Sequence, residues 1–327
     1  MRRLKALIGV VALCLTAAPA VAGAQQEIDN VEERLPEDQG LTDKTAVPIG
    51  VEARDKEQAG EAPLGSFVLT AVDISGASAI SPETFAPLYD GLLAQYVTLE
   101  DVAALAEAIT KLYRDKGYIL SRALIPPQNA AGGVLRVEIV EGYIDEILIE
   151  GDATPDIRKR LAAVAADRPL RMKTLERTLS LISDLSGVAV KSSKIVPDSG
   201  NLARHHLIVE IAQDRFEAGL YADNRGTEDA GVLQTYVSVA ANSVLRTGDQ
   251  IAGGVFFTPE DPNELVLGQI SYEAPLGRSG TVMRASVMTS YFDAGGPREA
   301  TEAESRTKRV NVSLTYPVIR RRNFTMW

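Results

Sequence analysis

The chain has 327 residues, a formal net charge of −10 at pH 7 and 45% hydrophobic residues. This length allows two or three domains, and the apolar content excludes a chain that is disordered throughout. The acidic balance argues against nucleic acid as a partner, because nucleic-acid binders carry a basic patch or stripe, and the longest basic run here is Arg320-Arg321-Arg322.

Residues 1–24 have the pattern of a cleaved signal peptide. A basic start with Arg2, Arg3 and Lys5 precedes an apolar run from Leu7 to Leu15, and Ala22-Gly23-Ala24 offers a small-residue cleavage site. The apolar run is short for a membrane span, which needs about 20 such residues. The single cysteine lies inside this segment, so we expect an exported protein without disulfide bonds.

Residues 25–65 are predicted to be an acidic linker, because their composition cannot bury much apolar surface. Ile28, Val31 and Leu35 fall at helical spacing, so the linker has room for one short helix near its start.

Residues 66–142 are predicted to form a module of βααββ order. Strands are expected where apolar and polar residues alternate, and helices where apolar residues recur at i, i+3, i+4 and i+7. Ser81-Pro82 is typical of a helix start, and Thr98 with Asp101 resembles a capping box. The expected elements are a strand at 67–74, helices at 82–92 and 99–116, and strands at 119–125 and 134–140.

Residues 143–213 repeat this order, although few letters are shared. The turn glycines Gly76 and Gly117 recur as Gly151 and Gly187, and the helix start at Ser81 recurs as Thr154. Start and stop signals that stay in register indicate an internal repeat. We therefore predict two tandem βααββ modules.

Residues 214–327 carry six strand-like stretches and no helical pattern. In the fifth, Met283, Ala285 and Val287 alternate with Arg284 and Ser286. A transmembrane β-barrel needs one face for lipid and one for water, although a soluble antiparallel sandwich would also alternate. The export signal and the alternation of short turns with long loops favour the barrel. The stretches lie at 216–224, 232–242, 249–257, 265–275, 281–292 and 309–317.

No residue pattern points to catalysis, a cofactor or a metal. The two histidines, His205 and His206, are adjacent at a strand start, so their side chains should point to opposite faces. Asp73, Glu138 and Glu141 are lone carboxylates on predicted strands. We therefore expect neither an enzyme nor a cofactor nor a small-molecule substrate.

The stretch "GYILSRALIPPQNAAGGVLRVEIVEGYIDEILIEG", from Gly117 to Gly151, carries the most specific motifs of the chain. It holds Pro126-Pro127-Gln128, a Gly-Val-Leu strand start at Gly133 and a Val-Glu-Gly exit at Gly142. It resembles the junction between the two POTRA modules of the two-partner secretion transporters, the hemolysin secretion/activation proteins of Gram-negative outer membranes. The resemblance extends over about residues 67 to 327.

The resemblance implies an α+β fold plus membrane β: two POTRA modules at 66–142 and 143–213, followed by the first strands of an antiparallel transmembrane barrel. The family barrel has sixteen strands, of which this chain has six stretches and the start of another, and the family's Val-Arg-Gly loop motif is absent here. We therefore expect a C-terminally truncated fragment. A plug helix of the family would fall within residues 25–45, where "EIDNVEERL" is the candidate.

The implied function is an outer-membrane protein translocator. It would act as a monomer, with its POTRA modules in the periplasm, and would bind a large unfolded exoprotein and pass it through the barrel without a cofactor. Two alternatives stay open: a barrel assembly factor of the same superfamily, which usually has more modules, and a soluble periplasmic binding protein.

The residues most suited to bind the exoprotein lie on the expected strand 119–125. By analogy with POTRA modules this strand should be at the sheet edge, where an extended peptide can add as a further strand. Pro126-Pro127 would end the edge. The docking residues are then Ile119, Ser121, Ala123 and Ile125, and a proline at Ala123 should remove one ladder donor. The alternative is that this edge only packs on the neighbouring module or linker.

Overall fold

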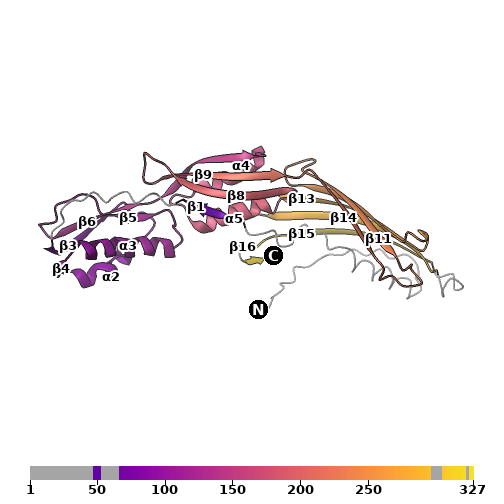
Figure 1. Cartoon of the computed structure of the whole chain (residues 1–327), viewed down its shortest axis with the longest axis horizontal. Coiled ribbons are helices and arrows are strands. Elements are labelled where there is room, and N and C mark those ends of the chain that lie inside the picture. The colour runs from indigo at the N-terminus through magenta and orange to yellow at the C-terminus, as the bar shows by residue number, and fades with distance from the viewer. Residues whose placement is uncertain (1–46, 53–65, 296–303, 322–323) are drawn as a thin grey trace. The chain divides into compact units, whose positions relative to one another are not determined.

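The computed structural model describes residues 47–52, 66–295, 304–321 and 324–327 (Figure 1). Its described residues divide into two compact units, 47–180 with 190–211, and 181–189 with 212–327. The predicted signal peptide and the candidate plug helix lie outside the described residues. Among the helices described, none is long and apolar enough to cross a membrane.

The first module has the predicted order of elements, but its first strand is divided in two. Phe67 and Val68 pair with a short strand at 96–97, whereas 71–75 joins the main sheet. That sheet has the order β3-β6-β5, with β3 parallel and β5 antiparallel to β6. The strands are β2 (Phe67–Val68), β3 (Ala71–Ser75), β4 (Tyr96–Val97), β5 (Arg122–Leu124) and β6 (Val134–Val140).

The helices of this module differ in regularity. The predicted first helix is three short turns, namely η2 (Pro82–Thr84), α2 (Ala86–Tyr89) and η3 (Asp90–Leu92). Pro87 and Gly91 explain the interruption, because proline removes a helical donor and glycine is a poor helix former. The second helix, α3 (Leu99–Asp115), begins with the predicted capping box between Thr98 and Asp101. Its apolar side packs in a core that includes Phe85, Ile109 and Val137.

The second module repeats this plan with longer strands. Its elements are β7 (Tyr143–Gly151), α4 (Pro155–Ala166), α5 (Met172–Ser183), β8 (Val188–Pro197) and β9 (Arg204–Gln213). Thr154 caps α4 as predicted, since its hydroxyl accepts a bond from Ile157 N at 3.4 Å. The sheet order is β1-β8-β9-β7, and β7 runs parallel to β9.

The strand β1 (Ile49–Val51) corrects the prediction that residues 25–65 are only a linker. It runs parallel to β8, with Ile49 opposite Ser193 and Val51 opposite Ile195. Ser193 N donates to Pro48 O at 3.1 Å, and Glu52 N donates to Ile195 O at 3.0 Å. A three-residue strand gives almost no periodic signal, so its pairing is set by the partner edge rather than by its own sequence.

The other unit is dominated by a six-stranded antiparallel sheet of order β10-β11-β12-β13-β14-β15, drawn orange to yellow in Figure 1. Its strands correspond to the six predicted stretches, although the sixth begins five residues earlier than predicted: β10 (Phe216–Asp223), β11 (Gln234–Asn242), β12 (Gln250–Phe257), β13 (Leu265–Leu276), β14 (Thr281–Asp293) and β15 (Glu304–Thr315). A short hairpin of β16 (Ile319–Arg321) and β17 (Phe324–Met326) follows.

The two faces of this sheet differ in chemistry, as the alternation predicted. The register places one set of aliphatic residues on what we call the apolar face; it includes Leu220, Val237, Val239, Val255, Ile270, Val287, Val310, Val312 and Leu314. The opposite face, which we call the polar face, carries Ser238, Asn242, Gln269, Glu273, Arg284, Ser286 and Asn311, together with a buried apolar cluster that includes Phe256, Leu267 and Phe292. Ile270 is 67% exposed and Glu273 only 4%, which is the reverse of a water-soluble sheet.

Ionic contacts join distant parts of this unit. Arg284 Nη2 lies 2.6 Å from Glu273 Oε2, and Ser186 Oγ donates to the other oxygen of the same carboxylate at 3.3 Å. Arg320 binds both oxygens of Asp184 at 2.8 Å. Paired in this way, the nearly buried carboxylates avoid the cost of an isolated charge.

Candidate functional site

The predicted docking strand is the outer strand of its sheet, but it is shorter than expected. β5 contains only Arg122–Leu124, next to β6. Ile119 lies in a turn, and Ser121 precedes the strand with its N–H bonded to Tyr118 O at 3.2 Å. Of the four predicted docking residues, therefore, only Ala123 belongs to the strand.

The outward backbone of β5 is already partly occupied. Ala123 N donates to Thr110 Oγ1 of α3 at 3.0 Å, and this hydroxyl donates in turn to Ala106 O at 2.8 Å. The donor that the sequence assigned to an incoming strand is thus held by a helix side chain. Ile125 N–H has no partner among the described residues and is the donor left on this edge. Thr110 was not predicted, because a threonine inside a helix gives no signal of a partner outside it.

The side chains of the edge face the module rather than its surroundings. Ser121 and Ala123 are 2% and 8% exposed, and Ile125 packs against the core. Ser121 Oγ also accepts a bond from Gly142 N at 3.3 Å. What this edge can offer a partner is therefore mainly backbone, with Arg122 and Leu124 as half-buried flanking side chains.

The Pro-Pro-Gln motif ends the β5–β6 ladder, and its glutamine side chain replaces the next pair of backbone hydrogen bonds. The register pairs Arg122 with Val140 and Leu124 with Glu138, so Pro126 falls opposite Arg136. Proline has no N–H for Arg136. The Gln128 amide supplies both missing partners, because its Nε2 donates to Arg136 O at 2.7 Å and its Oε1 accepts from Arg136 N at 2.7 Å. A side chain thus completes β6 where the backbone of β5 stops.

The two glycines of the predicted junction motif lie where other chain segments approach closely. Gly133, at φ +80°, accepts bonds from Thr70 N and Thr70 Oγ1 at 2.7 and 3.0 Å. A Cβ on Gly142 would overlap the Leu120 carbonyl. Gly142 O accepts from Leu170 N at 3.0 Å, so this residue links the first module to the second.

Glu141, one of the three lone carboxylates, accepts four hydrogen bonds. It accepts bonds from Ser78 N and Ala79 N, both at 2.8 Å, from the Ser78 hydroxyl, and from Tyr113 Oη at 2.8 Å. Burial alone would raise the pKa of the Glu141 carboxyl, but these donors outweigh it and hold the pKa below its usual range. Burial and the neighbouring carboxylate raise the pKa of Tyr113. Glu141 therefore fixes the loop after β3 to the end of β6.

The two histidines have separate environments, as predicted. His206 Nε2 lies 3.2 Å from Asp198 Oδ2, whereas His205 Nδ1 lies 3.2 Å from Ala203 O. Within the described ranges, no group of three or more His, Cys, Asp or Glu side chains is arranged to hold a metal ion.

Comparison with known proteins identifies the first module directly. Residues 67–142 match the family model of the ShlB-type POTRA domain. The chain is 21% identical to the heme/hemopexin transporter protein HuxB of Haemophilus influenzae strain 86-028NP, over 80% of this chain and 46% of HuxB. It is 25% identical to the outer membrane transporter CdiB of Dickeya dadantii, over 64% of this chain and 38% of CdiB. The chain thus spans less than half the length of these relatives.

The fold matches a solved transporter. CdiB from Escherichia coli superposes with a TM-score of 0.62 at 18% identity, over 92% of this chain and 56% of that chain. CdiB from Acinetobacter baumannii gives a TM-score of 0.56 at 15% identity. Because the match extends well beyond residues 67–142, the predicted fold is confirmed: POTRA modules are followed by strands of an incomplete antiparallel β-barrel. The chain thus carries a ShlB-type POTRA domain and is similar to the transporters HuxB and CdiB.

Proposed function

We propose that the protein acts as an outer-membrane translocator of a two-partner secretion system. Its POTRA modules would bind an unfolded exoprotein in the periplasm, and its barrel would export that polypeptide as a monomer without a cofactor. The observation that carries this proposal is the order of parts: POTRA modules directly before a sheet with one apolar and one polar face. The names of the relatives, which are transporters, support it.

Two alternatives are less well supported. An assembly factor of the same superfamily would insert other barrels, but such factors usually carry more modules. A soluble periplasmic binding protein would not expose aliphatic residues across a whole sheet face, as Leu220 at 76% and Ile270 at 67% do here.

The exoprotein is proposed to dock on the edge of the first module. An added strand would pair with Ile125 N–H and the outward Ala123 carbonyl, and it would compete with Thr110 for Ala123 N–H. Gln128 and the two prolines would limit how far it extends. Thr110 therefore gives a direct test, because the isosteric Thr110→Val exchange releases the Ala123 donor without changing the shape of the helix.

The test measures binding of the secretion domain of a large exoprotein encoded beside this chain, using the full chain in detergent. Thr110→Val should bind about five-fold more tightly, the value of one hydrogen bond, and Thr110→Ser, which keeps the hydroxyl, should bind like the unmodified chain. Ile125→Pro, which removes the remaining outward donor, should bind more weakly. Equal affinity in all three variants, with unchanged circular dichroism, would contradict docking at this edge.

A further inference from the structure

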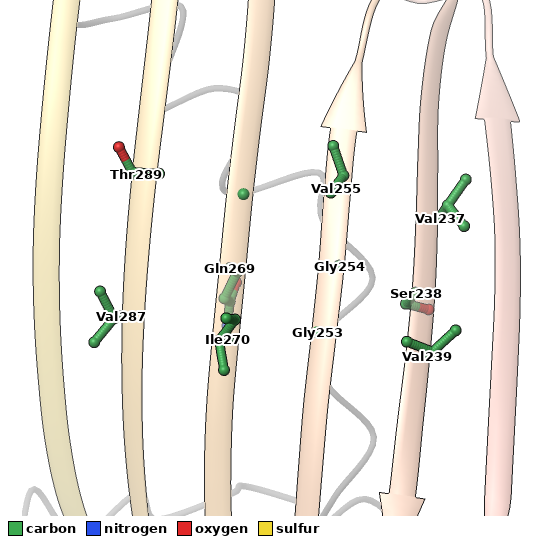
Figure 2. A pocket seen from close by; sticks show the side chains of 11 residues that line it. Val237, Ser238, Val239, Gly253, Gly254, Val255, Gln269, Ile270, Val287 and Thr289 are labelled. Atoms are coloured by element: carbon green, nitrogen blue, oxygen red, sulfur yellow. The ribbon is translucent and has the colours of Figure 1, made fainter.

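A shallow depression lies on the apolar face of the barrel sheet. It has a volume of about 500 Å³ and crosses the four strands β11 to β14. Figure 2 shows Val239, Val255 and Ile270 standing around the bare backbone of Gly253. Gly268, diagonal to Gly253 on the neighbouring strand, forms the other part of the floor, since Gly253 pairs with Ile270 and Val255 pairs with Gly268. The depression exists because two adjoining positions lack side chains.

Neither glycine is required by the fold. A Cβ on Gly253 would come no closer than 3.7 Å to Gln269 O, and one on Gly268 would lie 4.0 Å from Thr289 Cγ2. Both are ordinary contacts, and neither backbone is in the left-handed region. Gly254 is different, because its Cβ would lie 2.6 Å from the Tyr236 ring. Glycine weakens a strand and often marks a place where a ligand approaches closely, and packing does not explain these two.

A cation lies one strand beyond the depression. Thr289 in its lining pairs with Lys308 of β15, and Tyr291 pairs with Arg306. Directly paired residues have Cβ atoms about 5 Å apart on the same face, so both cations are on the apolar face. Arg306 contacts Glu304 at 2.7 Å and stacks over Tyr291 at 5.1 Å. Lys308 is exposed, and it places a positive charge at the rim of an apolar surface in an otherwise acidic chain.

We propose that this surface binds one phosphorylated membrane lipid, with an acyl chain in the depression and its phosphate at Lys308. The inference rests on the proposed function, which places the apolar face in a membrane. An acyl chain fits better than a polypeptide, because β11 to β14 are interior strands whose backbone groups are paired on both sides. A peptide laid across them would leave its own backbone groups unpaired in an apolar setting.

The test uses the full chain in detergent, with lipid A as the phosphorylated probe and phosphatidylcholine as its zwitterionic counterpart. Native mass spectrometry measures the fraction of chain that retains each lipid. Gly253→Val with Gly268→Val fills the depression, and Ala285→Val, which adds apolar bulk elsewhere on the apolar face, is the control. Lys308→Gln removes the charge, and Lys308→Arg keeps it.

The unmodified chain, Ala285→Val and Lys308→Arg should retain lipid A to the same extent. Lys308→Gln should lower its affinity about five-fold, as expected for one cation near a phosphate, and should leave phosphatidylcholine unchanged. The filled depression should retain less of both lipids. Equal retention by all folded variants would overturn this site. Exoprotein binding is measured on the same preparations to separate the two proposals. A preparation that retains lipid A as expected but does not bind the exoprotein contradicts only the proposed function.

Discussion

The two modules share a plan but protect their sheet edges in different ways. In the first module the edge strand β5 has three residues, ends at two prolines, and has one outward donor bonded to Thr110. In the second module the corresponding strand β8 has ten residues and is covered over part of its length by β1. One edge is thus closed by nearby side chains, and the other by a strand from far along the chain. An exposed edge invites uncontrolled pairing, so both solutions reduce that risk.

The difference matters because the two covers do not open equally easily. Thr110 occupies one donor of β5, so an incoming strand needs to displace only that bond. β1 contributes a short parallel ladder to β8, together with a Ser193 Oγ bond to Pro48 O at 2.8 Å and an ion pair between Lys194 and Glu52. The first edge is therefore the better site for a transient partner, and the second is the better-protected edge.

The largest expected effect concerns the glycine that positions the first edge. Gly142→Ala places a methyl group on the Leu120 carbonyl and should lower the free energy of unfolding of the first module by about 3 kcal/mol. Chemical denaturation followed by circular dichroism measures it. Gly132→Ala is the control, because nothing lies within 4 Å of its Cβ. Equal stability of the two variants would mean that this close approach is not fixed.

The second prediction removes the cover of the second edge. Ser193 N bonds to Pro48 O and Glu52 N to Ile195 O, so the N–H of the intervening Gly50 faces β8 in a parallel ladder. Gly50→Pro should therefore detach β1 and cost about 2 kcal/mol. Hydrogen exchange at Ser193 and Ile195 should accelerate. Val51→Pro, whose lost N–H points away from β8, should leave exchange nearly unchanged, and equal acceleration in both would refute this pairing.

A third prediction uses pH to separate the modules. The pKa of Glu141 is lowered in the folded state, so its stabilising contribution is present above the unfolded value of 4.5 and is lost as the pH falls through the folded pKa. Because Glu141 is partly exposed, we expect only about 1.5 kcal/mol. The difference in stability between the unmodified chain and Glu141→Gln should be constant near pH 7 and shrink below about pH 4.5. The corresponding residue of the second module, Gln213, carries no charge, so the second module lacks this pH dependence. A stability difference between the unmodified chain and Glu141→Gln that does not change with pH would contradict this role of Glu141.

The smallest expected effect is at the end of β5. Gln128→Ala leaves Arg136 N and O without their 2.7 Å partners at an exposed site, which should cost about 1 kcal/mol. Hydrogen exchange at Arg136 measures the change locally. Asn129→Ala, which removes only a bond to Ala131 N within the loop, should leave that exchange rate as it was. Slow exchange at Arg136 in Gln128→Ala would show that another group replaces the amide.

The sequence was most informative where signals repeat along many residues. Six alternating stretches predicted β10 to β15, and caps in register predicted both modules. It failed where one residue depends on a distant partner. Thr110 on α3 and Ser78 beside Glu141 carry no local pattern, and the short strand β1 has meaning only next to β8.

The predicted docking strand does lie at the edge of its sheet, but its extent differs from the prediction. The edge location of β5 was expected by analogy with POTRA modules. Its length was overestimated, because the apolar stretch before the prolines includes Ile119, where the chain forms a turn. The Pro-Pro-Gln motif was recognised as specific, but the sequence did not show what its glutamine does. The reason is geometric: only the register of β5 with β6 shows that Pro126 falls opposite Arg136.

The pairing of β1 with β8 also constrains the order in which the chain can fold. Residues 49–51 are synthesised before either module, whereas their partners at 193–195 follow only after the whole first module and most of the second. Contacts of such long sequence separation form late, because the intervening loop must be closed before they contribute. The first module therefore folds before the chain between β1 and β8 is closed into a loop. During refolding, β1 should be the last strand of its sheet to gain protection from hydrogen exchange.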